Sequence, residues 1–194
     1  MHVFIVYAHP CDDSFTRHAR DAFIEGLQAA GHTFTLSDLY AMDFSADMTE
    51  GEYLREAHYR DDLPLPADVL AEQAKVNAAD GIAFIYPVFW TEAPAKLVGW
   101  FDRVWTYGFA YGNRTMKTLD KGLVLCITGH TLPHLAQHGH LDSMKTVMLG
   151  DRLFDRVKRK EMIVLDGMAR GDADGRQAHW QAHLQTAYEA GKAF

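Results

Sequence analysis

Residues 81 to 111 have the sequence GIAFIYPVFWTEAPAKLVGWFDRVWTYGFAY, and the architecture is clearest here. Ile82 to Tyr86 form a short apolar run, typical of a strand that is buried on both faces, and Pro87 ends it. Pro94 stands where proline is tolerated, in the first turn of a helix. Apolar residues then recur at helical spacing, at Leu97, Trp100, Phe101, Val104 and Trp105. The stretch therefore predicts a strand, a loop and a helix that packs on a sheet.

The loop between this strand and this helix carries two adjacent aromatic residues, Phe89 and Trp90. In open α/β sheets such a loop lies at the carboxyl end of the strands, where ligands bind. Its residues suit a flat aromatic ligand held by backbone amides. The alternative is that both aromatics are ordinary packing residues at the edge of a sheet.

Residues 87 to 111 resemble the signature region of the flavin-dependent NAD(P)H:quinone reductases with a flavodoxin-like fold. The matching residues, in the family's order, are Pro87, Trp90, Pro94-Ala95, Lys96, Trp100-Phe101-Asp102-Arg103-Val104 and Gly108-Phe109-Ala110-Tyr111. The resemblance implies that this loop holds the flavin through Pro87, Val88, Phe89, Trp90 and Thr91. It also implies a substrate pocket lined by Trp90 and Tyr111, with Tyr111 facing the partner's pocket across a two-fold dimer.

A second candidate ligand loop follows the predicted first strand, Val3 to Tyr7. Ser14 or Thr16 can cap the next helix, whose free N-terminal amides offer a phosphate site. The loop matches neither G-x-G-x-x-G nor the P-loop, which disfavours a dinucleotide fold of that type or an NTPase. The resemblance implies that His9, Ser14 and Phe15 hold the flavin phosphate; taken alone, His9 also suits a hydrogen-bonded histidine at a strand end.

Four histidines stand close together after a further predicted strand, Leu123 to Ile127; they are His130, His134, His138 and His140. A spacing of four would let imidazoles on one helix share a zinc ion. Pro133 and Gly139 interrupt such a helix, and no cysteine accompanies the histidines, so we expect no metal.

The resembling family has Thr-Thr-Gly-Gly in this loop, followed by a tyrosine and a histidine that serve hydride transfer. Here His130 takes the place of the second glycine, and no tyrosine occurs between residues 111 and 188. The flavin contacts implied for this loop are Thr128, Gly129 and His130. The catalytic histidine is implied to be His138 or His140, and the sequence leaves the choice open.

The other predicted elements complete an alternating α/β pattern. They are a strand at residues 33–39, helices at 52–60, 67–79 and 144–157, a fifth strand at 162–165 and a terminal helix at 178–190. The pattern predicts a single flavodoxin-like domain over residues 1–194, with a five-stranded parallel sheet of order 2-1-3-4-5 and helices on both faces. Residues 41–66 are long for a connection, so we expect an arm that builds a dimer or covers a site, or else plain surface elaboration.

The composition narrows the possible functions. A formal net charge of -7 argues against nucleic-acid binding. The short basic cluster at residues 156–160 is expected to be a solvated helix end. No apolar run is long enough for a membrane span, and no signal segment precedes the first strand, so a cytoplasmic location is expected. Cys11 and Cys126 are expected to be free thiols.

Together these features favour an NAD(P)H-dependent flavin oxidoreductase, binding FMN or FAD, that reduces quinones or similar small electrophiles by two electrons as a homodimer. One alternative is a flavin-binding regulatory subunit of another system, such as an ion-efflux transporter, as some members of the family are. Another is a one-electron flavodoxin carrier.

Overall fold

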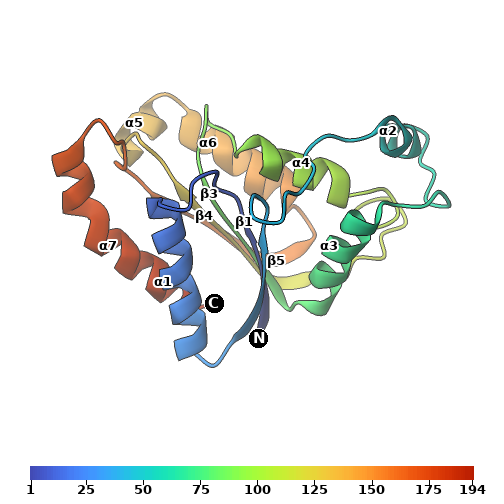
Figure 1. The fold of residues 1–194 in the computed structure, drawn as a ribbon, viewed down its shortest axis with the longest axis horizontal. Helices are drawn as coiled ribbons and strands as arrows, with labels where there is room; N and C mark the ends of the chain where they lie inside the picture. The colour runs from blue at the N-terminus through green and yellow to red at the C-terminus, as the bar shows by residue number, and fades with distance from the viewer.

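The structure is a computed structural model that describes residues 1–194. It contains a five-stranded parallel sheet of order β2-β1-β3-β4-β5, which confirms the predicted topology (Figure 1). The strands are β1 (His2–Tyr7), β2 (Thr33–Asp38), β3 (Gly81–Pro87), β4 (Leu119–Ile127) and β5 (Val157–Leu165).

Helices cover both faces of the sheet, as the sequence predicted. They are α1 (Phe15–Ala29), α2 (Glu50–Ala57), α3 (Ala67–Ala78), α4 (Ala95–Val104), α5 (Leu132–Gln137), α6 (His140–Lys145), the π-helix η1 (Thr146–Arg152) and α7 (Ala173–Lys192). One apolar cluster joins the sheet to α4 and η1, and a second joins the opposite face to α1 and α7. Every residue of β3 is buried, as expected for a central strand with helices on both sides.

Local signals account for the start of several helices. Ser14 is the N-cap of α1, and its Oγ accepts a hydrogen bond from the Arg17 amide at 3.2 Å. Thr49 and Glu52 form a capping box that starts α2. Pro94 is the N-cap of α4 and therefore precedes the first turn rather than lying within it.

The region before β5 differs from the sequence prediction. One helix was expected over residues 144–157, but Gly139, with a φ of 72°, starts α6, and η1 follows it directly. The interpretation of residues 156–160 as a helix end is wrong, because β5 begins at Val157 and pairs with an equally extended β4 from Leu119 onward. The charged side chains there lie on an edge strand, where charges discourage pairing with other chains.

The arm, residues 41–66, crosses α4 and carries α2 away from the sheet (Figure 1). The arm is held by Arg103 of α4, whose guanidinium contacts Glu52 of the arm at 2.8 Å and also Asp68 of α3 at 2.6 Å. Helix α2 was predicted over residues 52–60 and lies a little earlier in the chain, ending before Tyr59, which has a φ of 54°. Both cysteines are free, as predicted. None of the helices combines the length and the apolar content that crossing a membrane requires.

Candidate functional site

Three loops meet at the carboxyl edge of the sheet, because β1, β3 and β4 are parallel neighbours. The loops after β3 and β4 enclose a cavity of about 220 Å³. Its lining residues are Val88, Trp90, Thr91, Thr128, Gly129, His130, Leu135 and His140. Six of the residues singled out as flavin contacts therefore surround one cavity; we call it the ring cavity.

Several residues that line the ring cavity have backbone amides with no partner in the chain. The Val88 amide donates a hydrogen bond to the Ile127 carbonyl at 2.8 Å, and the Thr128 amide donates one to the Leu165 carbonyl at 3.0 Å, so both loops are fixed to the sheet. The next amides, of Trp90, Thr91, Gly129 and His130, donate to no other group of the chain. Such free donors suit the acceptor atoms at the edge of a flat heterocycle.

Both loop aromatics line an open groove beside the ring cavity, and Trp90 also lines the ring cavity itself. Trp90 is 99% exposed, so the alternative that it is a packing residue is wrong for this side chain. Phe89, 45% exposed, does not line the ring cavity; it lines a neighbouring open groove. Pro87 is the buried last residue of β3.

The four histidines form a column beside the ring cavity. The rings of His130 and His134 stack with centroids 4.2 Å apart, and those of His134 and His138 lie 4.3 Å apart. Partial desolvation, together with the neighbouring histidines, lowers the pKa of His134. Of the two candidate catalytic residues only His140 lines the cavity, while Nδ1 of His138 donates to the His134 carbonyl at 2.8 Å. In the structure no three His, Cys, Asp or Glu side chains are arranged to hold a metal ion.

A second cavity, of about 450 Å³, lies at the start of α1. It is lined by Asp13, Ser14, Phe15, Arg170, Arg176 and Trp180. The first amides of α1 have no partners within the helix, and its positive dipole end favours an anion. We call this the phosphate cavity.

Two arginines of the phosphate cavity were missed by the sequence analysis. Arg170 lies in the loop before α7, and Arg176 lies in the first turns of α7, which begins at Ala173 rather than at residue 178 as expected. The Arg176 guanidinium lies 5.0 Å from the Trp180 ring centre, and its Nε is buried without a hydrogen-bond partner. An anionic ligand would satisfy this nitrogen. The signal was the pair of arginines in MARGDADGR, residues 168–176.

His9 lies in the loop that leads to the phosphate cavity but does not line it. Its Nδ1 lies 2.9 Å from the carbonyl oxygen and 3.0 Å from the amide nitrogen of Cys11, in keeping with the simpler interpretation of a hydrogen-bonded histidine at a strand end. Burial lowers the pKa of His9, and the nearby positive charge of Arg170 acts in the same direction.

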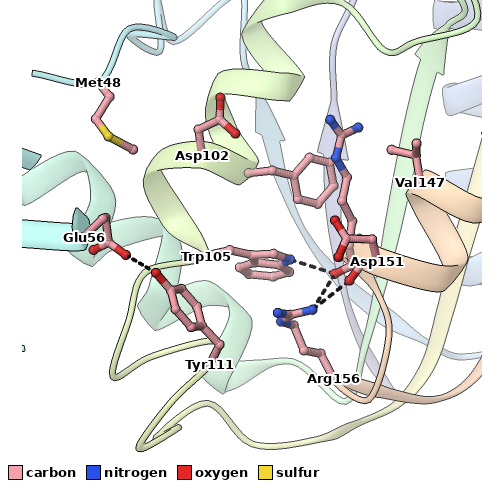
Figure 2. A pocket seen from close by; sticks show the side chains of 10 residues that line it. Met48, Glu56, Asp102, Trp105, Tyr111, Val147, Asp151 and Arg156 are labelled. Carbon is pink, nitrogen blue, oxygen red and sulfur yellow. Dashed lines mark hydrogen bonds between the residues drawn. The ribbon is translucent and has the colours of Figure 1, made fainter. Parts of the chain in front are cut away.

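Tyr111 lies in a third and larger cavity, of about 520 Å³, shown in Figure 2. Met48 and Glu56 of the arm, Trp105 next to α4 and Asp151 of η1 also line this cavity. The Tyr111 hydroxyl donates to Glu56 at 2.8 Å, and burial and this carboxylate raise the pKa of Tyr111 to about 12. The predicted substrate residues Trp90 and Tyr111 therefore line different cavities of one chain.

Several known proteins with a similar sequence or structure are named as oxidoreductases. The structure of NAD(P)H:quinone oxidoreductase from Methanothermobacter marburgensis is 46% identical, with a TM-score of 0.93, over 99% of this chain and 96% of that one. NAD(P)H dehydrogenase [quinone] 1 of Rattus norvegicus is 36% identical over 131 residues, which is 61% of this chain and 47% of that protein. Ribosyldihydronicotinamide dehydrogenase [quinone] of the same organism is 37% identical over 123 residues, 56% of this chain and 53% of that protein. The chain thus spans about half the length of these curated relatives.

A sequence model for a family described as having a flavodoxin-like fold matches residues 1–189, nearly the whole chain. The sheet order and the ligand-accessible loops at its carboxyl edge agree with that match. The chain therefore belongs to the flavodoxin-like fold family.

Proposed function

We propose that this protein is a flavin-dependent NAD(P)H oxidoreductase that transfers two electrons, in a ping-pong reaction, to quinones or similar small electrophiles. The observation that carries the proposal is the pairing of two cavities at one sheet edge: one presents arginines and helix amides, and the other presents four free loop amides. The quinone-reductase names of the relatives support the same activity.

The residues present fit a flavin phosphate. Ser14 and the first amides of α1 would hold its oxygens, and Arg176 would pair its buried Nε with the negative charge. Arg170 adds a second positive charge at the same cavity. This donor set suits the single phosphate of FMN or the first phosphate of FAD.

The residues of the ring cavity fit a flavin ring. Amides of Trp90, Thr91, Gly129 and His130 would donate to its oxygens and nitrogens, and Val88 would contact its apolar part. A bound flavin supplies the ability to accept a hydride from NAD(P)H and to pass two electrons to an acceptor. The protein orients the reactants and excludes water, and His140 stabilises negative charge or holds a proton at the cavity.

The substrate site is proposed to be completed by a second copy of the chain. Trp90 is exposed beside one cavity and Tyr111 lines another, so a two-fold dimer that brings the partner's Tyr111 cavity over Trp90 would enclose a quinone between aromatic surfaces. We further propose that residues 1–194 act as a single domain and that the protein works in the cytoplasm, which its free thiols favour.

The experiment that tests this function begins with the absorption spectrum of the purified protein and mass analysis of what is released on denaturation. We expect flavin absorption and FMN or FAD in the released fraction, and turnover of NADH or NADPH with a quinone in excess over a flavin-only control. A protein that binds no flavin after incubation with either cofactor contradicts the proposal. Flavin binding without any turnover would instead favour a regulatory subunit.

A further inference from the structure

The connection from β3 to α4 contains a strained turn. Phe89 and Glu92 exchange two backbone hydrogen bonds of 2.8 and 2.9 Å, and the two residues between them, Trp90 and Thr91, have φ angles of 52° and 69°. Turns with positive φ at both central positions normally use Asn-Gly, because other side chains are unfavourable there. A tryptophan and a β-branched threonine in this conformation persist only if the surroundings hold them.

The Trp90 side chain does not supply that support, because it is almost fully exposed. The Glu92 carboxylate supports the turn instead. Its Oε1 accepts hydrogen bonds from the Ala93 amide at 2.7 Å and from Arg152 Nη1 at 2.9 Å. Its Oε2 lies 3.4 Å from Arg152 Nη2, so the pair has a two-point contact.

Arg152 is itself held rigidly. Its side chain is 11% exposed, its guanidinium lies 4.7 Å from the centre of the Phe101 ring, and Nη1 lies 3.3 Å from the sulfur of Met148. Its carbonyl accepts a hydrogen bond from Trp105 Nε1 at 2.8 Å, which Figure 2 shows beside the Tyr111 cavity. The ion pair therefore anchors the turn to α4 and η1, outside the loop.

We propose that the Glu92–Arg152 ion pair is the positioning device that keeps the Trp90–Thr91 turn left-handed and so fixes Trp90 beside the ring cavity. Neither residue lines the ring cavity, although Arg152 lines the Tyr111 cavity, so their effect on Trp90 is exerted through the turn. The consequence for catalysis rests on the proposed function. The conformation of the turn is a property of the flavin-free chain.

The test is ¹⁹F NMR of the flavin-free protein labelled with 5-fluorotryptophan, with the Trp90 signal assigned from Trp90→Phe. We expect one Trp90 signal in the wild type, and a shifted and exchange-broadened one in Glu92→Ala and Arg152→Met. Thr91→Gly removes the β-branched side chain from a left-handed position. In the double variant Glu92→Ala/Thr91→Gly, the Trp90 signal should therefore return toward its wild-type position. If Glu92→Ala acted only through loss of packing, Thr91→Gly would not rescue the signal.

A matched control is Asp38→Ala. Asp38 likewise accepts a backbone amide, from Ala41 at 3.1 Å, and an arginine, Arg20 at 3.3 Å, but it makes no hydrogen bond to the turn. This variant should leave the Trp90 signal unchanged. An unaltered signal in both Glu92→Ala and Arg152→Met overturns the proposal.

The catalytic consequence is measured separately, by stopped-flow reduction of the flavin-loaded protein. Glu92→Ala should slow hydride transfer on the order of ten- to a hundredfold, as displacement of a positioning group does, and Thr91→Gly should restore part of the rate. If the variants change the NMR signal but the protein binds no flavin, the positioning role is supported and the proposed function is contradicted. The failure of one proposal can therefore be told apart from the failure of the other.

Discussion

Arg176 has a buried Nε with no partner, which is costly unless a ligand satisfies it. We expect Arg176→Gln to weaken flavin binding by on the order of tenfold or more, since a hydrogen bond to a charged group contributes about 1.5–3 kcal/mol. Ser14→Asp should weaken flavin binding more than Arg176→Gln does, because a carboxylate beside the phosphate adds like-charge repulsion. Fluorescence titration of apoprotein with FMN and FAD measures both.

Arg159→Gln is the matched control, because it removes an exposed arginine on β5, outside the phosphate cavity. Its flavin affinity should equal that of the wild type. Equal affinity in all three variants would show that the phosphate binds elsewhere.

The lowered pKa of His134 predicts that the free energy of unfolding depends on pH. Its folded-state pKa is lowered, so between that value and the ordinary value of about 6.5 the unfolded chain binds more protons than the folded chain. The free energy of unfolding should therefore fall as pH drops below about 6.5, and level off below the folded pKa. Urea unfolding at pH 8 and pH 5.5 should show a smaller difference for His134→Gln than for the wild type. His58→Gln, a change at an exposed histidine of the arm, should keep the full difference.

His140 and His138 should differ in kinetics, because only His140 lines the ring cavity. If His140 stabilises charge during the reaction, His140→Gln should slow flavin reduction or reoxidation by on the order of ten- to a thousandfold, with nearly unchanged flavin affinity. His138→Gln should have the smaller effect. Stopped-flow measurements with and without a chelator also test the alternative of a metal site. Loss of bound zinc in the variants, reproduced by a chelator in the wild type, would contradict the assignment of His140 as the group that stabilises charge.

At the scale of single elements, Gly99 allows the arm to cross α4. A Cβ at this position would lie 2.2 Å from the Ala46 carbonyl oxygen and 2.6 Å from its Cα. We expect Gly99→Ala to destabilise the protein by about 1–3 kcal/mol, as overpacking does, despite the better helix propensity of alanine. Gly51→Ala in α2 meets no atom closer than 4.0 Å and should be neutral or slightly stabilising. Urea unfolding measures both, and equal stability of the two variants would contradict this account.

How much could be predicted differs from element to element. The buried run of β3 and the apolar stripe of α4 are local signals, so the sequence alone placed them. The capping box of Thr49 and Glu52 was an equally local signal and was overlooked. The start of β5 could not be placed, because its charged residues are tolerated only through pairing with β4, a contact between distant parts of the chain.

The residues of the candidate site likewise divide into those with a local sequence signal and those whose placement depends on tertiary contacts. Val88 and Thr128 could be expected near one cavity, because each follows a parallel strand and the family motif marks both loops. The pair Arg170 and Arg176 is visible in the sequence, but the approach of Arg176 to Ser14 could not be expected, because it depends on how α7 packs beside α1. The separation of Trp90 from Tyr111 likewise depends on tertiary structure.

At the scale of the whole molecule, the exposed aromatic surface predicts self-association. The rings of Tyr59, Tyr107 and Tyr111 form a row, with centroids 5.2 and 5.6 Å apart, and Tyr59 is 64% exposed. Contiguous exposed apolar surface of this kind marks an interaction site, and Trp90 is also uncovered in one chain. We expect a homodimer at micromolar concentration by sedimentation velocity.

Tyr59→Glu should shift this equilibrium toward monomer, because a charge would be buried at the interface. Since the flavin cavities lie within one chain and the proposed substrate site lies between two, the monomer should keep most of its flavin affinity and lose quinone turnover. Leu70→Glu, at an exposed position of α3, is the control and should remain dimeric and active. A wild-type protein that is monomeric at micromolar concentration with full turnover would contradict the shared substrate site, and Trp90 and the loop amides of one chain would then have to suffice for the reaction.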